Sequence, residues 1–160
     1  MCKKRNSRFI VVMTAFMSLA TRSGLAGVTN GDFAYGLDHW TIEAGTIEHS
    51  IDDEAIFAPD PDEALSSTLS QVFTLDTGAL TLCFDVRMET ESEDGTPETD
   101  VFTASLSGTT FYTLSSSDVS GGSFEQTVSY DVSNWAGEEV ELRFSLEHDY
   151  ADHRYIRVPG

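Results

Sequence analysis

The side chains best suited to binding a ligand are aromatic. Sugars stack their apolar faces on exposed rings and direct their hydroxyls to polar neighbours, so exposed tyrosine or tryptophan favours carbohydrate binding. The available rings are Tyr35, Tyr112, Tyr130, Trp135, Tyr150 and Tyr155. We expect Tyr35 to face solvent, Tyr112 and Tyr150 to be the more exposed of the later rings, and Trp135 to pack. The sequence therefore predicts Tyr35, Tyr112 and Tyr150 as candidate carbohydrate-binding residues.

Patterns typical of catalysis are missing from the sequence. It has no G-x-S-x-G nucleophile elbow, and no cysteine-histidine arrangement can be built around Cys83. No acid pair suited to glycoside hydrolysis can be singled out among the 27 carboxylates. We therefore expect a protein that is not an enzyme.

The first 26 residues predict a secretory signal peptide. Residues 1–8 carry four basic side chains and no acid, and the next twelve residues, FIVVMTAFMSLA, are almost wholly apolar. Twelve apolar residues are too few to span a bilayer, which takes about twenty. Cleavage after Ala26 would leave residues 27–160 as a single domain, secreted or held at a bacterial cell surface and without a membrane span. An uncleaved N-terminal anchor is the alternative.

Removal of that segment would make the chain strongly acidic. Five of the nine basic residues precede Gly27 and all 27 acids follow it, which leaves four arginines and a formal charge of −23, against −18 for the whole chain. Such a surface repels phosphate backbones and excludes nucleic acid as a partner. Two simpler explanations of the acidic composition are solubility in salty surroundings and calcium-rich surroundings in which carboxylates are tolerated. Cys83 would be the single cysteine, buried in LTLCFDV, so stability would depend on the core rather than on disulfides.

The elements that position these side chains are expected to be strands. Apolar and polar residues alternate over residues 67–75, 79–88, 100–106, 125–132 and 139–147, with shorter candidates at 40–48, 55–59, 109–114 and, weakly, 154–158. No window of twelve residues after residue 26 has a helical apolar stripe. Two acidic loops, near 51–64 and 89–100, interrupt the strands. The pattern predicts an all-β protein, an antiparallel β-sandwich or a barrel.

A resemblance to a known family runs through these segments. NGDFAYGLDHWT is similar to the N-G-(D/S)-F-E-x-G-L-x-x-W opening of galactose-binding-like jelly-roll domains, found in carbohydrate-binding modules and in exported bacterial proteins of the PEP-CTERM-associated type. The later pieces follow in the family's order: SSTLSQVFTL, ALTLCFDVRM, TDVFTASLSG and SYDVSNWAGEEVELRFSLEHDYAD. Together they cover residues 28–152. In this setting we expect Gly31 and Gly36 to form turns, Phe33, Leu37 and Trp40 to enter the core, and His39 to face solvent.

The resemblance also implies a possible structural calcium. These domains often hold calcium between the opening loop and the last strand, and calcium takes six to eight oxygen ligands. Asp32 matches the opening turn, and Asp149 and Asp152 would substitute for a closing aspartate. Two departures weaken the match: Ala34 stands where glutamate is frequent, and YIRVPG, at residues 155–160, replaces a longer hairpin and a final I-D-(N/D)-V strand.

Two functions follow as expectations. By analogy with the family, the chain is a secreted binding module for polysaccharide or other cell-surface polymers. The alternative is a structural domain for surface or matrix interactions that binds no small molecule. Two or more exposed aromatics on the concave sheet face would favour the first, and a face of short Ser, Thr and Asp side chains would favour the second.

Overall fold

The computed structural model describes residues 9–14 (backbone only), 27–58, 66–79, 81–90, 100–119 and 123–147. Within these ranges the chain forms ten strands and two short 3₁₀ helices. The strands are β1 (Phe9–Thr14), β2 (Thr41–Ala44), β3 (Thr46–His49), β4 (Ala55–Ala58), β5 (Ser66–Thr74), β6 (Thr81–Thr90), β7 (Val101–Leu106), β8 (Thr109–Ser115), β9 (Ser123–Asp131) and β10 (Glu139–Glu147), and the helices are η1 (Ser116–Asp118) and η2 (Ser133–Trp135).

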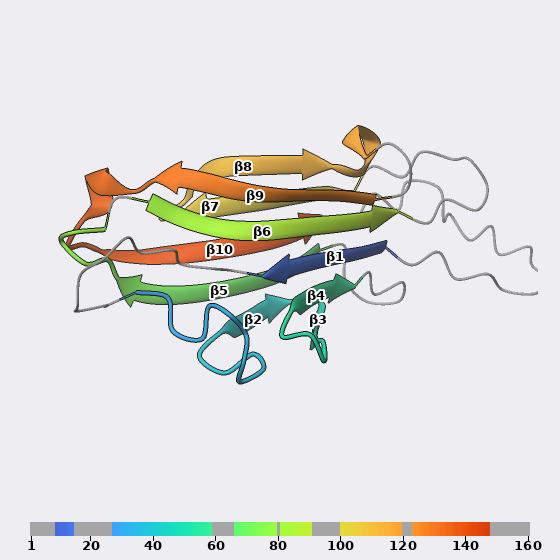
Figure 1. Cartoon of the computed structure of the whole chain (residues 1–160), viewed down its shortest axis with the longest axis horizontal. Helices are drawn as coiled ribbons and strands as arrows, with labels where there is room; N and C mark the ends of the chain where they lie inside the picture. The colour runs from blue at the N-terminus through green and yellow to red at the C-terminus, as the bar shows by residue number, and fades with distance from the viewer. Residues whose placement is uncertain are drawn as a thin grey trace, which may run out of the picture.

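The strands make two antiparallel sheets of five strands each (Figure 1). We call the sheet with the order β3-β4-β1-β6-β9 sheet A, and the sheet with the order β2-β5-β10-β7-β8 sheet B. All of the pairings are antiparallel. The predicted all-β fold, an antiparallel β-sandwich, is confirmed.

The core lies between the two sheets because alternate residues of each strand point inward. In β10 the inward positions are Val140, Leu142, Phe144 and Leu146, all buried. Phe144 is at the centre of the aromatic contacts: its ring centroid lies 5.2 Å from that of Phe84 in sheet A and 6.1 Å from that of Phe102, on which it stacks. Rings from both sheets therefore fill one continuous core.

Strand β1 lies between β4 and β6 in sheet A. Its residues belong to the apolar run that the sequence predicts as part of a signal peptide, where no strand was expected. Val11 is the partner of Phe57 in β4 and of Met88 in β6, and Met13 is the partner of Ala55 and Val86. A short run rich in valine and isoleucine has high strand propensity, which explains how it can pair on both sides.

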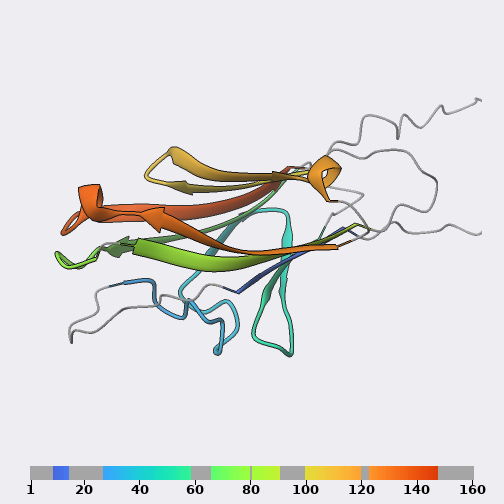
Figure 2. The same ribbon diagram turned by 45° about the horizontal axis from the view of Figure 1, so that its top comes forward.

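The chain crosses from sheet B to sheet A at Gly45, between β2 and β3. Gly45 has a φ of +67°, and a Cβ added there would lie 2.6 Å from the backbone oxygen of Ser66 and would clash with Ser67 Oγ. Only glycine fits this position. Figure 2 shows that the β3–β4 hairpin projects from the sandwich on the same side as the opening loop, residues 27–40.

Several expected boundaries shift in the structure. The single predicted strand at residues 40–48 is split in two at Gly45. Glu89 belongs to β6, and Asp100, expected in a solvated loop, is only 3% exposed. Cys83 is half-buried rather than buried, because the inward positions of β6 are Leu82, Phe84, Val86 and Met88. The weak strand expected at residues 154–158 lies outside the described residues.

Candidate functional site

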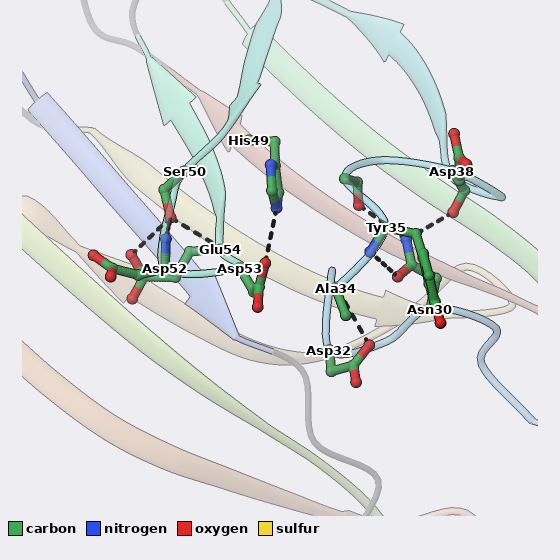
Figure 3. A network of polar contacts seen from close by, with 11 residues as sticks. Asn30, Asp32, Ala34, Tyr35, Asp38, His49, Ser50, Asp52, Asp53 and Glu54 are labelled. Carbon is green, nitrogen blue, oxygen red and sulfur yellow. Dashed lines mark hydrogen bonds and ion pairs between the residues drawn. The ribbon is translucent and has the colours of Figure 1, made fainter.

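The opening loop, residues 27–40, is organised by Asn30 (Figure 3). The Asn30 Nδ2 atom donates hydrogen bonds to the backbone oxygens of Gly36 (2.9 Å) and Asp38 (3.0 Å). Its Oδ1 atom accepts a hydrogen bond from the backbone N–H of Tyr35 (3.0 Å), and its own backbone oxygen accepts one from Trp40 Nε1 (3.1 Å). One amide side chain thus satisfies three backbone groups that an irregular loop would otherwise leave to solvent.

The same loop is tied to sheet B by Gln71. Its Nε2 atom donates hydrogen bonds to the backbone oxygens of Thr29 (2.9 Å) and His39 (3.0 Å), and its Oε1 atom accepts one from the N–H of Thr29 (2.7 Å). Gln71 is buried at an inward position of β5, between Leu69 and Phe73. The sequence analysis missed this residue, although an amide on the apolar face of a predicted strand marks a position that needs internal partners.

The apolar residues of the loop enter the core as predicted. Phe33 and Trp40 are buried, with ring centroids 5.4 Å apart, and Trp40 also contacts Phe144. Leu37 packs against them as a half-buried residue. The prediction of core packing for these residues is confirmed.

Gly31 and Gly36 both lie in turns of the loop, as predicted. Gly36 has a φ of +69°, while Gly31 is not among the residues with positive φ. Asn30 (+54°), Phe33 (+54°) and His39 (+71°) take the left-handed conformation instead. Asparagine tolerates this region well, and the buried ring of Phe33 offsets the local strain there.

Tyr35 belongs to this hydrogen-bonded opening loop. It is 77% exposed, while its backbone N–H is held by Asn30. Asp32, Asp38 and His39 are exposed in the same loop. The predicted exposure of Tyr35 and His39 is confirmed, and the same loop carries two exposed carboxylates.

The predicted calcium ligands are not brought together among the described residues. Asp32 is exposed, and its Oδ1 atom accepts a hydrogen bond from the N–H of Ala34 (3.3 Å), an ordinary Asx turn. Asp149 and Asp152 lie outside the described residues. In the part of the chain that the structure describes, no three Asp, Glu, His or Cys side chains are grouped so that they could hold a metal ion.

A second polar loop, residues 49–54, connects β3 and β4 and is drawn beside the first in Figure 3. Ser50 Oγ accepts hydrogen bonds from the N–H groups of Asp52 (3.1 Å) and Glu54 (3.2 Å). His49 Nε2 lies 3.6 Å from Asp53 Oδ1. These contacts are typical of a tight hairpin turn, in which a serine caps the backbone groups that the strands leave unpaired.

Tyr112 is less exposed than predicted. Its ring is half-buried and contacts Phe84 (5.8 Å) and Phe102 (6.4 Å), and its hydroxyl donates a hydrogen bond to Gln126 Oε1 in β9 (3.2 Å). Burial raises the pKa of this hydroxyl above its usual value. Tyr112 points inward because it is paired with buried Ala104 and shares the face of Leu114; the register of β7 and β8 then shifts between Ala104 and Ser105, which leaves Phe111 as the extra residue of a β-bulge. A bulge re-aims side chains, so both Phe111 and Tyr112 contact Phe84.

Three aromatic side chains, those of Phe111, Tyr130 and Trp135, close the open side of the sandwich between the edge strands β8 and β9. The ring of Tyr130 stacks on Phe111 at 4.2 Å and contacts Trp135 at 5.9 Å. All three residues are half-buried against the core. The expectation that Trp135 packs is confirmed, while Tyr150 and Tyr155 lie outside the described residues.

The outer face of sheet B consists mainly of short polar and charged side chains, with Val72 as an exposed apolar residue. Arg143, in the middle of β10, lies 2.8 Å from Glu43 Oε2 and 3.2 Å from Glu141 Oε1. Ser70 Oγ donates a hydrogen bond to Glu43 Oε1 (2.7 Å). Around this group the outward positions of β5, β7, β8 and β10 are Thr68, Val72, Thr74, Thr103, Ser105, Thr113 and Ser145. The described part of this face carries no exposed aromatic ring.

Comparisons of the chain with protein-family models, with curated proteins and with solved structures find no match. Among the described residues, no helix is long and apolar enough to cross a membrane. The resemblance to galactose-binding-like domains therefore stays a prediction from the motifs. The structural features that bear on function are the opening loop and the outer face of sheet B.

Proposed function

We propose that this protein is an exported, non-catalytic β-sandwich that serves as a surface or matrix interaction domain. The galactose-binding-like jelly roll implied by the sequence motifs is part of this proposal, as are secretion and the loss of residues 1–26. Its partner is a polar macromolecule of the cell surface or matrix, contacted through hydroxyls and carboxylates.

The observation that supports this proposal is the composition of the outer face of sheet B. Ser105 and Thr103 in β7, Thr113 in β8 and Ser145 in β10 offer hydroxyls, and Arg143 is already paired with two glutamates. Flat faces of this kind make many weak hydrogen bonds to a partner but offer no ring on which a sugar could stack.

A matched pair of substitutions tests this face. Ser105→Arg places a long cation on the outer face of sheet B, and Ser129→Arg makes the same change on β9 of sheet A. We expect Ser105→Arg to lower the fraction of exported protein retained with the cell-surface fraction, and Ser129→Arg to leave it near wild type. Equal retention for both variants and the wild type would argue against sheet B as the interaction face.

Carbohydrate binding is the second candidate, and one observation favours it. Tyr35 is 77% exposed on a loop whose backbone Asn30 holds in place, with Asp32 and Asp38 exposed nearby. An exposed ring on a loop with a well-held backbone suits a sugar, because little loop entropy is lost on binding.

A glycan array separates the two candidates. If sugars bind at this loop, Tyr35→Ala should abolish the signal, Tyr35→Phe should keep most of it because the ring remains, and Ile51→Ala, a change at another exposed apolar residue, should have no effect. No binding of the wild type to any polysaccharide would leave the interaction domain as the better proposal.

A further inference from the structure

The middle of sheet A contains a strand that export would remove. β1 lies within the segment expected to be cleaved, yet it pairs with β4 on one side and with β6 on the other. Without it, β4 and β6 would face each other across the width of one missing strand, each with a row of unpaired N–H and C=O groups. Such edges are costly to leave buried and act as templates for another extended segment.

The gap left by β1 has a defined chemistry. Two of its register positions, those of Val11 and Met13, are two residues apart in the sequence and lie opposite core residues. The described neighbours of these positions are all buried: Phe57 and Met88 beside the first, Ala55 and Val86 beside the second. A replacement strand must therefore present two apolar side chains at alternate positions.

The gap also has a defined direction. Glu147, the last residue of β10, is paired with Ser66 at the start of β5 and with Val101 at the start of β7. The loops that precede these two residues come from the ends of β4 and β6. Figure 1 shows β4, β6 and β10 all ending at the right of the view, where β1 begins. A segment that follows β10 would enter the gap from the same end as β1 and run antiparallel to both neighbours.

We propose that in the exported chain residues 154–158 take the place of β1 between β4 and β6. The inference rests on the proposed function, since it requires export with loss of residues 1–26. Six residues, 148–153, separate β10 from this segment. An extended chain of that length spans about 20 Å, while packed sheets lie about 10 Å apart, so the connection can reach sheet A.

The side chains of residues 154–158, RYIRV, match the gap. Ile156 and Val158 are two residues apart and take the positions of Val11 and Met13. Arg157 then takes the outward position of Val12, between Ile56 and Arg87, in a row that continues to Glu48 on one side and to Glu125 on the other. Arg154 takes the position of Phe9 at the end of the strand, beside Thr90.

A segment on the same chain has an advantage over a strand from another molecule. The short connection gives residues 154–158 an effective local concentration in the millimolar range, well above that of a second copy at ordinary protein concentrations. The same gap, filled in trans, would give a dimer, which makes the oligomeric state part of the test.

The experiment measures hydrogen exchange of the exported protein after its intact mass has been determined. Ile156→Asp places a charge at an inward position of the proposed strand, and Tyr155→Asp makes the same change at the neighbouring outward position. We expect Ile156→Asp to speed amide exchange in β4 and β6 about tenfold or more, with β5 and β10 much less affected, and Tyr155→Asp to change little. Ile156→Ala is the milder variant if Ile156→Asp does not fold.

The outcomes separate the two proposals. A mass that retains residues 9–14 would overturn the proposed export and cleavage, and with them this inference. A mass that begins near Gly27, together with equal exchange of β4 and β6 in the wild type and both Ile156 variants, would overturn the inference alone. A dimer whose dissociation exposes β4 and β6 would assign the gap to a second copy and likewise overturn it.

Discussion

The two sheets of the sandwich depend on different parts of the chain. In sheet B the central strand β10 pairs over nine positions with β5 and six with β7, and every strand comes from residues 41–147. In sheet A the central strand β1 comes from residues 9–14, which the sequence assigns to a signal peptide. The removal of residues 1–26 that we propose would therefore take the central strand from sheet A and leave every strand of sheet B in place.

The largest effect is expected at the centre of sheet B. Phe144 is fully buried and contacts rings from both sheets, so Phe144→Ala should lower the free energy of unfolding by about 3–5 kcal/mol. Because sheet B does not use β1, the loss should be similar in the precursor and in the exported chain. Urea denaturation of both forms measures it. Val72→Ala, at an exposed position of β5, is the control and should stay within about 0.5 kcal/mol of wild type.

The second-largest loss of stability is expected at Gly45, where the chain crosses between the two sheets. Gly45→Ala meets both an unfavourable φ and the backbone of Ser66, so we expect a loss of about 2 kcal/mol or more. Gly36→Ala is the matched control, since Gly36 has a similar φ (+69°) but nothing within 4 Å of the added Cβ. Thermal melts of the two variants separate the loss of stability caused by the steric clash from the loss caused by the unfavourable φ. Equal losses would show that the crossing between sheets is not tightly packed.

A smaller effect is expected at the opening loop that leads into sheet B. Asn30→Ala removes the hydrogen bonds to Gly36, Asp38 and Tyr35 and should cost about 1–2 kcal/mol. Asp32→Ala removes one exposed contact and should have little effect on stability. Chemical denaturation compares the two. A larger loss for Asp32 than for Asn30 would indicate that Asp32 binds something beyond its own turn, such as the calcium implied by the family resemblance.

The smallest effect is expected at the end of β9 in sheet A. The side chain and backbone N–H of Ser133 hydrogen-bond to Asp131 and lower the pKa of this carboxyl below its usual 3.8. A carboxyl whose pKa is lower in the folded state than in the unfolded state stabilises the fold at pH values above its unfolded pKa. This stabilisation is lost as the pH falls through the folded pKa. Asp131→Asn should therefore make the loss of stability below about pH 4 less steep. Urea melts from about pH 5 to pH 2 measure it, and an unchanged slope would contradict the assigned cause.

Much of the fold could be predicted from the sequence, because alternation decides which face of a strand is buried. β10 was predicted at its observed bounds, and β5 and β7 within one residue. The alternation could not show the break at Gly45, where backbone contacts between distant segments decide the course of the chain. It also could not place β1, since an apolar run is equally typical of a signal peptide and of a buried strand.

The candidate site was predicted less well, for two physical reasons. Tyr112 shares the inward face of Leu114, and the β-bulge at Phe111 brings a second, adjacent ring to Phe84; bulges leave little trace in a single sequence. The role of Gln71 depends on the carbonyls of Thr29 and His39, which lie 42 and 32 residues away. By contrast, the exposure of Tyr35 and the burial of Phe33 and Trp40 followed from the spacing of one motif.

The intact mass of the exported protein tests the difference between the two sheets most directly. The account predicts a chain that begins near Gly27, so that sheet A keeps β4 and β6 but has lost residues 9–14. An exported protein whose mass retains residues 1–20 would contradict it, because β1 would then be a permanent strand and the two sheets would be equally complete.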